Sequence, residues 1–302
     1  MVDRDHVFLL GRAPGPARPR TLPEPGESVS ASGPARCAAR LWYRRASMHT
    51  AEVTFRVRGQ VDPQVCDEAT EALLRAWASN GQLVGSWHRV RAGELLAAFV
   101  AIPDADSLSS KFESPTVRRA GSRVAAARIA GPEVRILGPQ PQTETPCRCA
   151  RWESLVLYAG EFSTAPPLRC GSCFSPIPLY RVPPTCEDGF DDVLSWEADY
   201  RACDRLQSGS ATGSRFGVRQ LAEHESPLSR EGRDLAARIE SAIRVPVFYF
   251  LFRPPSKKPE AELRRTCPGC GGEWRLEQPR SGRFDFECRG CRLLSNLGCA
   301  VP

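Results

Sequence analysis

Two groups of four cysteines constrain this chain more than any other feature of its sequence. The C-terminal group consists of two Cys-X-X-Cys pairs separated by seventeen residues: Cys267, Cys270, Cys288 and Cys291. This spacing is typical of a zinc ribbon, in which two tight turns present four thiolates to one tetrahedral ion. The sequence therefore predicts a zinc ion held by these four cysteines.

The first group is less regular, because its first pair has one spacer residue instead of two. It comprises Cys147, Cys149, Cys170 and Cys173, with twenty residues between the pairs. We interpret it as a second four-thiolate zinc site. The alternative is that Cys147 and Cys149 are ordinary thiols and that the other two cysteines form a redox pair. A redox pair normally opens a helix, and Pro176 argues against a helix at this position.

The composition is that of a soluble intracellular protein. The chain has 13 cysteines, and its first residues lack the charged and then apolar layout of a signal peptide, so we expect reduced thiols in the cytoplasm. No stretch approaches the roughly 18 apolar residues of a membrane span. Five further cysteines lack paired spacing and are expected to be buried or bystander thiols: Cys37, Cys66, Cys186, Cys203 and Cys299.

The first 47 residues differ in composition from the rest of the chain. They are rich in Pro, Gly, Ala, Ser and Arg and show no apolar periodicity. They therefore lack the apolar area that would offset the entropy of ordering, and we predict a disordered tail over residues 1–47. Regular patterning begins at Met48, which raises the hypothesis that Met48 is the natural start and that the tail is a translation-start artefact.

Residues 48–140 show strand and helix patterns in the order β-α-β-β-α-β. Val53, Phe55 and Val57 alternate with polar residues, as in a half-buried strand. Asp62 and Pro63 are typical of a helix start. The apolar stripe of this helix is predicted at Val65, Ala69, Leu73 and Trp77.

The remaining elements complete the pattern of this region. They are strands over residues 84–90 and 94–101, a helical stretch that opens at Asp104, breaks at Pro115 and resumes over 117–128, and a strand over 134–137. The order predicts a ferredoxin-like domain, which makes the chain an α+β protein. That arrangement hosts too many activities to indicate one.

The rest of the chain divides into two predicted parts. Residues 141–263 hold the first cysteine group and a helical segment, and residues 264–302 form the C-terminal zinc ribbon. Predicted elements of the middle part are strands at 155–158 and around Ile177 and Leu179, helices over 187–206 and from Ser226, and a strand over 247–252. In the ribbon an alternating apolar pattern predicts a hairpin: Trp274, Leu276, Phe284 and Phe286.

The charge balance argues against a large general phosphate-binding surface. The formal net charge is +6, of which residues 1–47 carry +4. Because ligating thiols are deprotonated, two zinc sites leave the remainder at about −2. Arginines nevertheless flank aromatic residues in the ribbon, an arrangement that suits a single-stranded nucleic acid unless the aromatics form the ribbon's own core. The candidate contacts are Trp274, Arg275, Arg280, Arg283, Arg289 and Arg292.

Two segments resemble a known family. Residues 170–183 (CGSCFSPIPLYRVP) and 284–296 (FDFECRGCRLLSN) resemble an uncharacterised bacterial family described as containing a zinc ribbon and suggested to bind nucleic acid. The resemblance covers about residues 48–297 and leaves the predicted tail outside. It implies metal binding and a cytoplasmic location, suggests a nucleic-acid role and assigns no reaction.

Recognisable catalytic motifs are absent from the sequence. The four histidines are scattered, and there is neither a phosphate-binding glycine loop nor a Gly-X-Ser-X-Gly elbow. We therefore predict a non-enzymatic protein with two structural zinc ions and no small-molecule substrate. It is expected to bind nucleic acid through the ribbon or, alternatively, to dock on a larger protein assembly.

Overall fold

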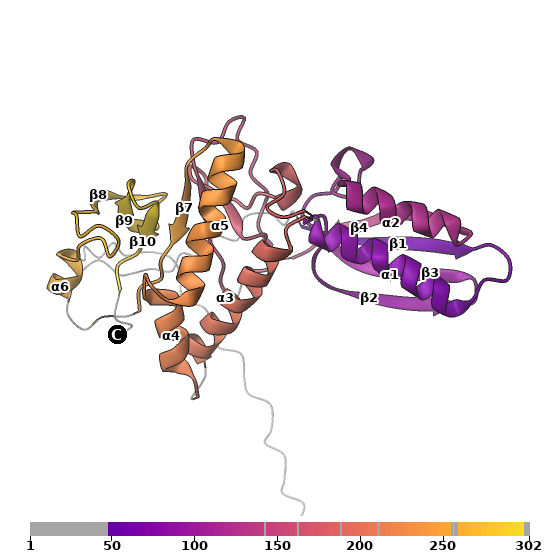
Figure 1. The fold of residues 1–302 in the computed structure, drawn as a ribbon, viewed down its shortest axis with the longest axis horizontal. Coiled ribbons are helices and arrows are strands. Elements are labelled where there is room, and N and C mark those ends of the chain that lie inside the picture. The colour runs from indigo at the N-terminus through magenta and orange to yellow at the C-terminus, as the bar shows by residue number, and fades with distance from the viewer. Residues whose placement is uncertain are drawn as a thin grey trace, which may run out of the picture. The chain divides into compact units, whose positions relative to one another are not determined.

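The computed structural model describes residues 48–298, apart from positions 142, 162, 188, 210, 211, 255, 257 and 258. The predicted tail over residues 1–47 lies outside the described residues, as do Cys37 and Cys299. The described chain is a mixed α+β structure whose strands form one sheet of four strands and one of six (Figure 1). Within this part of the chain, no helix is both long enough and apolar enough to span a membrane.

Residues 49–139 form the four-stranded sheet and its helices. The elements are β1 (His49–Val57), α1 (Pro63–Ser79), β2 (Val84–Ala92), β3 (Leu95–Ile102), a 3₁₀ turn (Ser110–Phe112), α2 (Pro115–Ala126) and β4 (Ile129–Pro139). The strands lie in the order β2-β3-β1-β4, and each neighbouring pair is antiparallel. Inward-facing residues of β1 pack with α1 and α2 in one core cluster, so both helices cover the same face of this sheet (Figure 1).

Helix α1 begins where the sequence predicts it, but its buried face is shifted from the predicted stripe. The side chain of Asp62 accepts a hydrogen bond of 2.9 Å from the Gln64 N–H, and Pro63 occupies the first turn. The predicted stripe is wrong in part, because Val65 is 45% exposed. The buried residues are Cys66, Thr70, Leu73, Leu74, Ala76 and Trp77. Both sets have helical spacing, so periodicity alone could not choose between them.

The second predicted helix starts later than expected. Asp104 does not open a helix; its carboxylate instead accepts ion pairs from Arg181 at 2.9 Å and Arg148 at 3.1 Å. Helix α2 begins at Pro115, so the proline starts the helix at the position where the sequence pattern predicts a break. A proline is well tolerated in the first helical turn, where its missing N–H would have no partner within the helix.

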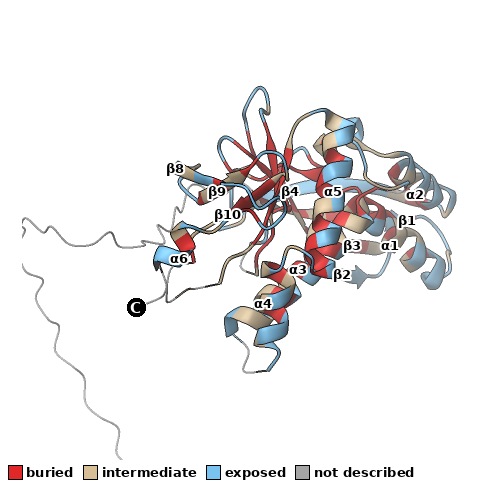
Figure 2. Cartoon of the chain, turned by 60° about the vertical axis from the view of Figure 1, so that its left-hand side comes forward, coloured by how far each residue is buried: buried red, intermediate tan, exposed pale blue. Residues whose placement is uncertain are grey.

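Residues 155–295 form the six-stranded sheet and four further helices. The elements are β5 (Leu155–Leu157), β6 (Leu168–Cys170), a 3₁₀ turn (Leu179–Arg181), α3 (Asp191–Gly209), α4 (Ser214–Ala222), α5 (Pro227–Ile243), β7 (Val247–Phe250), α6 (Pro259–Leu263), β8 (Arg275–Arg280), β9 (Phe284–Cys288) and β10 (Leu293–Ser295). The buried side of α5 packs toward the central strands, as the red stripe along this helix indicates (Figure 2).

The six-stranded sheet connects the segments that carry the two cysteine groups. Its strands lie in the order β6-β5-β7-β10-β9-β8. Strand β7 is parallel to both β5 and β10, whereas the other pairs are antiparallel. One core cluster includes Cys147 from the first group together with Phe286 and Leu293 from the C-terminal strands. The sheet thus includes strands on both sides of residue 264, where the sequence predicts a boundary. The predicted domain boundaries stay predictions.

Three elements of this part differ from the sequence prediction. Ile177 and Leu179 do not form a strand; Leu179 begins a 3₁₀ turn, because the adjacent prolines cannot donate to a sheet ladder. Helix α3 begins at Asp191, four residues after the predicted start. Helix α4 was not predicted at all, since it directly follows a glycine- and serine-rich stretch that reads as a linker.

Candidate metal centres

Eleven described cysteines are free thiols, and eight of them gather in two clusters. These clusters are the two groups that the sequence predicts. Among the described residues, the cysteine, histidine and carboxylate side chains whose ligand atoms lie close enough to hold a metal ion form these same two groups. The remaining described cysteines lie outside both groups: Cys66, Cys186 and Cys203.

The first group brings together cysteines from separate segments. Its four Sγ atoms lie within 4.8 Å of one another. The Sγ atoms of Cys149 and Cys170 are 3.9 Å apart, and those of Cys147 and Cys173 are 3.6 Å apart. Four sulfurs bound to a tetrahedral zinc ion are about 3.8 Å apart, since each lies ~2.3 Å from the metal. Sulfurs in a disulfide are only ~2.05 Å apart. The spacing therefore fits a metal site.

Backbone turns direct the thiols of the first group toward one point. The Cys149 N–H donates to the Sγ of Cys147 at 3.4 Å. The Phe174 N–H donates to the carbonyl oxygen of Cys170 at 2.9 Å and closes the turn that contains Cys173. A turn thus follows β6 where a redox pair would normally open a helix. All four cysteines contribute to the cluster, in contrast to the redox alternative.

The second group is built around the β8–β9 hairpin. Cys267 and Cys270 lie in the turn before β8, Cys288 ends β9, and Cys291 lies in the turn before β10. All four Sγ atoms lie within 4.8 Å of one another, and those of Cys270 and Cys288 are 3.7 Å apart. The turn before β8 requires glycine, because a Cβ on Gly269 would lie 2.9 Å from the Cys291 Sγ.

The cysteines of each group differ in acidity. Burial raises the pKa of Cys173, but the N–H and hydroxyl of Ser175 and the neighbouring thiols lower that pKa to about 7. The Gly272 N–H, followed by the neighbouring thiols, lowers the pKa of Cys270 to about 7. Burial and the neighbouring sulfurs raise the pKa of Cys291 to about 12. At least one thiol per group therefore ionises near neutral pH, and loss of all four protons requires a cation at the centre.

His224 lies beside Gly269 in the turn that carries Cys267 and Cys270, although nothing in the sequence spacing indicates this. A Cβ on Gly269 would lie 3.3 Å from the His224 Nε2 and 2.9 Å from the Cys291 Sγ. The histidine side chain is 12% exposed, and its Nδ1 hydrogen bonds with the carboxylate of Glu225. The Nδ1 contact with Glu225 fixes the orientation of the imidazole beside this turn.

The tip of the β8–β9 hairpin contacts the first group. The Ser281 hydroxyl donates to the carbonyl oxygen of Gly171 at 3.1 Å. The Arg280 guanidinium donates to the hydroxyl of Ser154 and to the carboxylate of Glu287. Gly171 is required here, because a Cβ at this position would lie 2.8 Å from the backbone carbonyl oxygen of Ser154. One hairpin therefore carries Cys288 of the second group and contacts the turn of the first.

The aromatic residues of the ribbon are core residues. Trp274, Phe284 and Phe286 are 2%, 3% and 0% exposed. The indole N–H of Trp274 donates to the carbonyl oxygen of Arg265 at 2.9 Å. None of these three rings presents an open face for a nucleic-acid base to stack on.

Three of the predicted nucleic-acid contacts are arginines in ion pairs within the protein. Arg280 and Arg289 pair with Glu287 at 2.8 and 3.0 Å. Arg292 contacts Glu240 of α5 through its Nε at 2.9 Å and its Nη2 at 3.0 Å. The first two pairs lie within the ribbon, and the third joins the ribbon to α5. All three reduce the positive charge on the surface of the ribbon.

The other two predicted arginines are at the surface. Arg275 and Arg283 are exposed, and the guanidinium of Arg283 lies 4.8 Å from the centroid of the Phe174 ring. The ribbon thus offers fewer arginines to a ligand than its sequence suggests.

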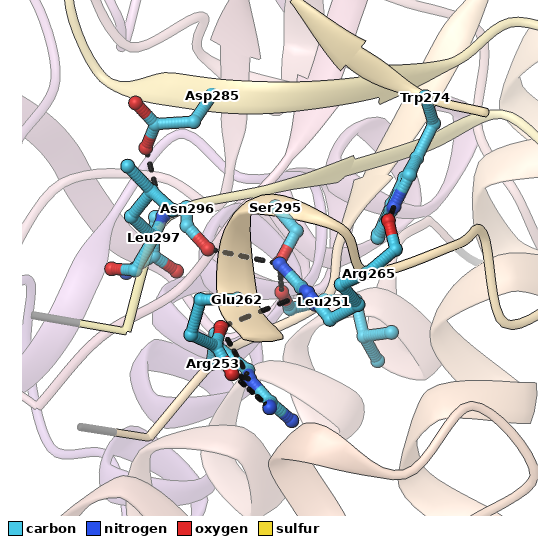
Figure 3. A network of polar contacts seen from close by, with 9 residues as sticks. All are labelled: Leu251, Arg253, Glu262, Arg265, Trp274, Asp285, Ser295, Asn296 and Leu297. Atoms are coloured by element: carbon cyan, nitrogen blue, oxygen red, sulfur yellow. Dashed lines mark hydrogen bonds and ion pairs between the residues drawn. The ribbon is translucent and has the colours of Figure 1, made fainter. Parts of the chain in front are cut away.

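A half-buried arginine that the sequence did not indicate anchors the ribbon (Figure 3). The Arg265 guanidinium donates to the Ser295 hydroxyl at 3.1 Å. It lies 4.3 Å from the Phe286 ring centroid. It also donates to the carbonyl oxygen of Asn296 at 3.0 Å. Burial, followed by the nearby charge of Arg253, lowers the pKa of Arg265 to about 10. These contacts connect the segment before Cys267 to β10.

Comparison with known families divides the chain into three segments. Residues 48–138 match a domain of unknown function (DUF8589), residues 149–252 match another (DUF2310), and residues 256–301 match a third (DUF8594). Together the three matches extend over nearly all the described residues, and none of these descriptions assigns an activity.

Two proteins of Haemophilus influenzae, both named as uncharacterised, are similar to this chain. One is 29% identical over 231 residues, which cover 75% of this chain and 88% of the relative. The other is 36% identical over 142 residues, which cover 47% of this chain and 70% of the relative.

A solved structure from Caulobacter crescentus, named provisionally as an antibiotic biosynthesis monooxygenase, is 12% identical and covers 32% of this chain and 93% of its own. Its TM-score of 0.25 is too low to carry an argument.

Proposed function

We propose that this chain, which belongs to a family of uncharacterised bacterial proteins with a member in Haemophilus influenzae, is a non-enzymatic protein. Its two zinc ions are structural. The observation that carries this proposal is the gathering of eight cysteine Sγ atoms into two clusters of tetrahedral size. Each cluster joins segments that are distant in sequence, such as those of Cys147 and Cys173 or of Cys270 and Cys288.

Zinc is the ion that these ligands favour. Sets of four thiolates select zinc or iron, whereas magnesium and calcium prefer oxygen ligands. Iron is expected in the same sites when the protein is produced without enough zinc. Because thiol ligands must stay reduced, the proposal also includes a cytoplasmic location.

A structural role follows from the complete ligand sets. Four thiolates fill a tetrahedral coordination sphere and leave no position for water or substrate. When bound, each ion supplies a crosslink whose binding energy becomes folding energy. In zinc-finger peptides that energy is about 10–16 kcal/mol, comparable to the whole net stability of a domain. Loss of one ion is therefore expected to unfold the segments that it joins.

The finer fold assignments are part of the proposal. A ferredoxin-like domain over residues 48–140 is supported by the element order from β1 to β4 and by the strand order β2-β3-β1-β4. A zinc ribbon over residues 264–302 is supported by the two cysteine turns that flank the β8–β9 hairpin.

We do not extend the proposal to base stacking by the ribbon. Stacking needs exposed aromatic faces, and Trp274 and Phe286 are buried. Arg275 and Arg283 keep exposed guanidinium groups, so phosphate contacts at the ribbon stay a prediction.

Metal analysis of the purified full chain tests the proposal. Native mass spectrometry and elemental analysis of protein produced with added zinc should give two zinc ions per chain. Cys173→Ser and Cys270→Ser should each lose one ion, because each removes a ligand from a different cluster. Cys186→Ser is the matched control, since Cys186 lies outside both clusters and its replacement should leave two ions bound. Two ions in every variant, or none in the unmodified chain, would contradict the proposal.

A further inference from the structure

Positive charge is concentrated in the segment from Ser114 to Pro132. This segment contains four arginines and no aspartate or glutamate. Helix α2 lies within it and buries Val117, Ala120 and Val124 in the core of the four-stranded sheet. Its exposed residues are Pro115, Arg118, Arg119, Ser122, Arg123, Ala125 and Ala126. After the proline of its first turn, the exposed face of α2 is thus made of arginines and small residues.

Two arginines of this face are not neutralised by carboxylates. In the described part of the chain, neither Arg118 nor Arg123 forms an ion pair. Arg118 instead donates to the backbone carbonyl of Glu113 at 2.7 Å, a neutral acceptor. On the neighbouring helix α1, Glu71 already pairs with Arg75 at 2.9 Å. The face differs in this respect from the ribbon, where three arginines form ion pairs.

The spacing of the arginines extends the charge beyond one helical turn. Arg119 and Arg123 are four residues apart, about 6 Å along the helix axis. Like charges at this spacing oppose helix formation slightly, and α2 contains no carboxylate to compensate. Beyond the helix, the Arg58 N–H donates to the carbonyl oxygen of Arg128 at 3.1 Å. Both of these arginines are exposed, so the charge continues past the end of α2.

We propose that the exposed face of α2 binds the phosphate backbone of a nucleic acid without reading its bases. Guanidinium groups match phosphate oxygens in geometry and stay charged at any physiological pH. Protein interfaces usually centre on apolar or aromatic residues, and membrane-bound helices insert them. The α2 face exposes no aromatic and no large apolar side chain, and small side chains such as Ser122 and Ala126 let an extended backbone approach closely.

Oligonucleotide binding to the zinc-loaded full chain tests the proposal. Fluorescence anisotropy with labelled single-stranded and duplex oligonucleotides, at low and near-physiological salt, gives the affinity and its salt dependence. In the triple variant Arg118→Gln/Arg119→Gln/Arg123→Gln we expect the affinity to fall at least about tenfold. The slope of log K against log salt should become shallower by about 2 for a single strand, since each phosphate contact contributes about 0.7. Glutamine has nearly the helix propensity of arginine, and a thermal melt checks that the variant folds.

A second triple variant controls for net charge. Arg215→Gln/Arg219→Gln/Arg230→Gln removes the same charge from exposed positions on α4 and α5, and its affinity should stay within about twofold of the unmodified chain. The proposal is overturned if the unmodified chain binds neither oligonucleotide at low salt, or if both triple variants lose affinity equally. It is also overturned if poly-glutamate binds through the same arginines as tightly as the oligonucleotide, which would indicate an acidic protein partner. No cysteine ligand is altered, so this result and the metal analysis are independent.

Discussion

The hydroxyl of Ser281 donates to the backbone carbonyl of Gly171 at 3.1 Å, which connects the tip of the β8–β9 hairpin to the turn of the first cysteine group. The same hairpin ends in Cys288, a member of the second group. Because one short hairpin carries both contacts, its position depends on both groups. We therefore expect metal binding at either group to strengthen binding at the other.

Loss of the second site should weaken the first. In Cys270→Ser the base of the hairpin loses its metal crosslink, so Ser281 is no longer held against Gly171. We expect the zinc affinity of the first site to fall about fivefold or more, as coupling energies of about 1–3 kcal/mol imply. Competition with a chromophoric zinc chelator measures this affinity.

Two further variants separate the contact from the cysteine replacement. Ser281→Ala keeps all eight ligands and should reduce the coupling without removing either site. Cys186→Ser makes the same chemical change outside both groups and should leave both affinities unchanged. Equal affinity of the first site in Cys270→Ser and in the unmodified chain would show that the two sites are independent.

Gly269 should be the sensitive glycine of the second site. An alanine Cβ at this position would lie 2.9 Å from the Cys291 Sγ and 3.3 Å from the His224 Nε2. Overpacking of this kind costs about 1–3 kcal/mol, so Gly269→Ala should weaken zinc binding at the second site roughly tenfold. Gly290→Ala is the matched control in the same site, because a Cβ on Gly290 would meet no atom within 4 Å. Similar losses in both variants would contradict this explanation.

Features that depend on neighbouring residues could be predicted from the sequence. The cysteine groups were found because a Cys-X-X-Cys spacing fixes two thiols within one turn. The start of α1 was found because Asp62 caps it through a hydrogen bond to the residue two positions along the chain. The buried side of α1 was predicted only in part, since Val65 and Cys66 both fit a helical repeat and only the packing decides between them.

Partners distant in sequence could not be predicted in the same way. Arg292 pairs with Glu240, which lies 52 residues earlier in the chain. Arg265 lies over Phe286, and His224 lies beside Gly269, although no spacing connects either pair. The sequence predicts a positive surface on the ribbon because it shows the arginines but not the carboxylates that pair with them. For the same reason α2, where neither Arg118 nor Arg123 forms an ion pair in the described part of the chain, was not singled out.

Loss of one ligand from the second site should unfold the ribbon and spare the four-stranded sheet. In Cys288→Ser we expect the amides of β8, β9 and β10 to lose protection from hydrogen exchange, because the crosslink that orders this hairpin is gone. Strand β1 is paired on both sides within the other sheet and should stay protected. Mass-spectrometric exchange on the full chain measures both regions, and retained protection of β9 would refute this prediction.

Glu197 should make stability depend on pH near neutrality. Burial, opposed by the charges of Arg201 and Arg169, raises the pKa of Glu197 from its ordinary 4.5 to about 7. Between these values the folded protein keeps a proton that the unfolded chain has lost, so the free energy of unfolding decreases as pH rises through this window. The decrease is at most about 3 kcal/mol and is complete above pH 7.

Glu197→Gln removes the titrating carboxyl and should flatten the dependence. We expect this variant to melt at a higher temperature than the unmodified chain at pH 8, and the difference should shrink toward pH 5. Thermal melts with saturating zinc at each pH keep metal release out of the comparison. Glu231→Gln, at an exposed position on α5, controls for the loss of a glutamate in a helix. A difference between Glu197→Gln and the unmodified chain that does not change with pH would show that burial does not hold the proton on Glu197.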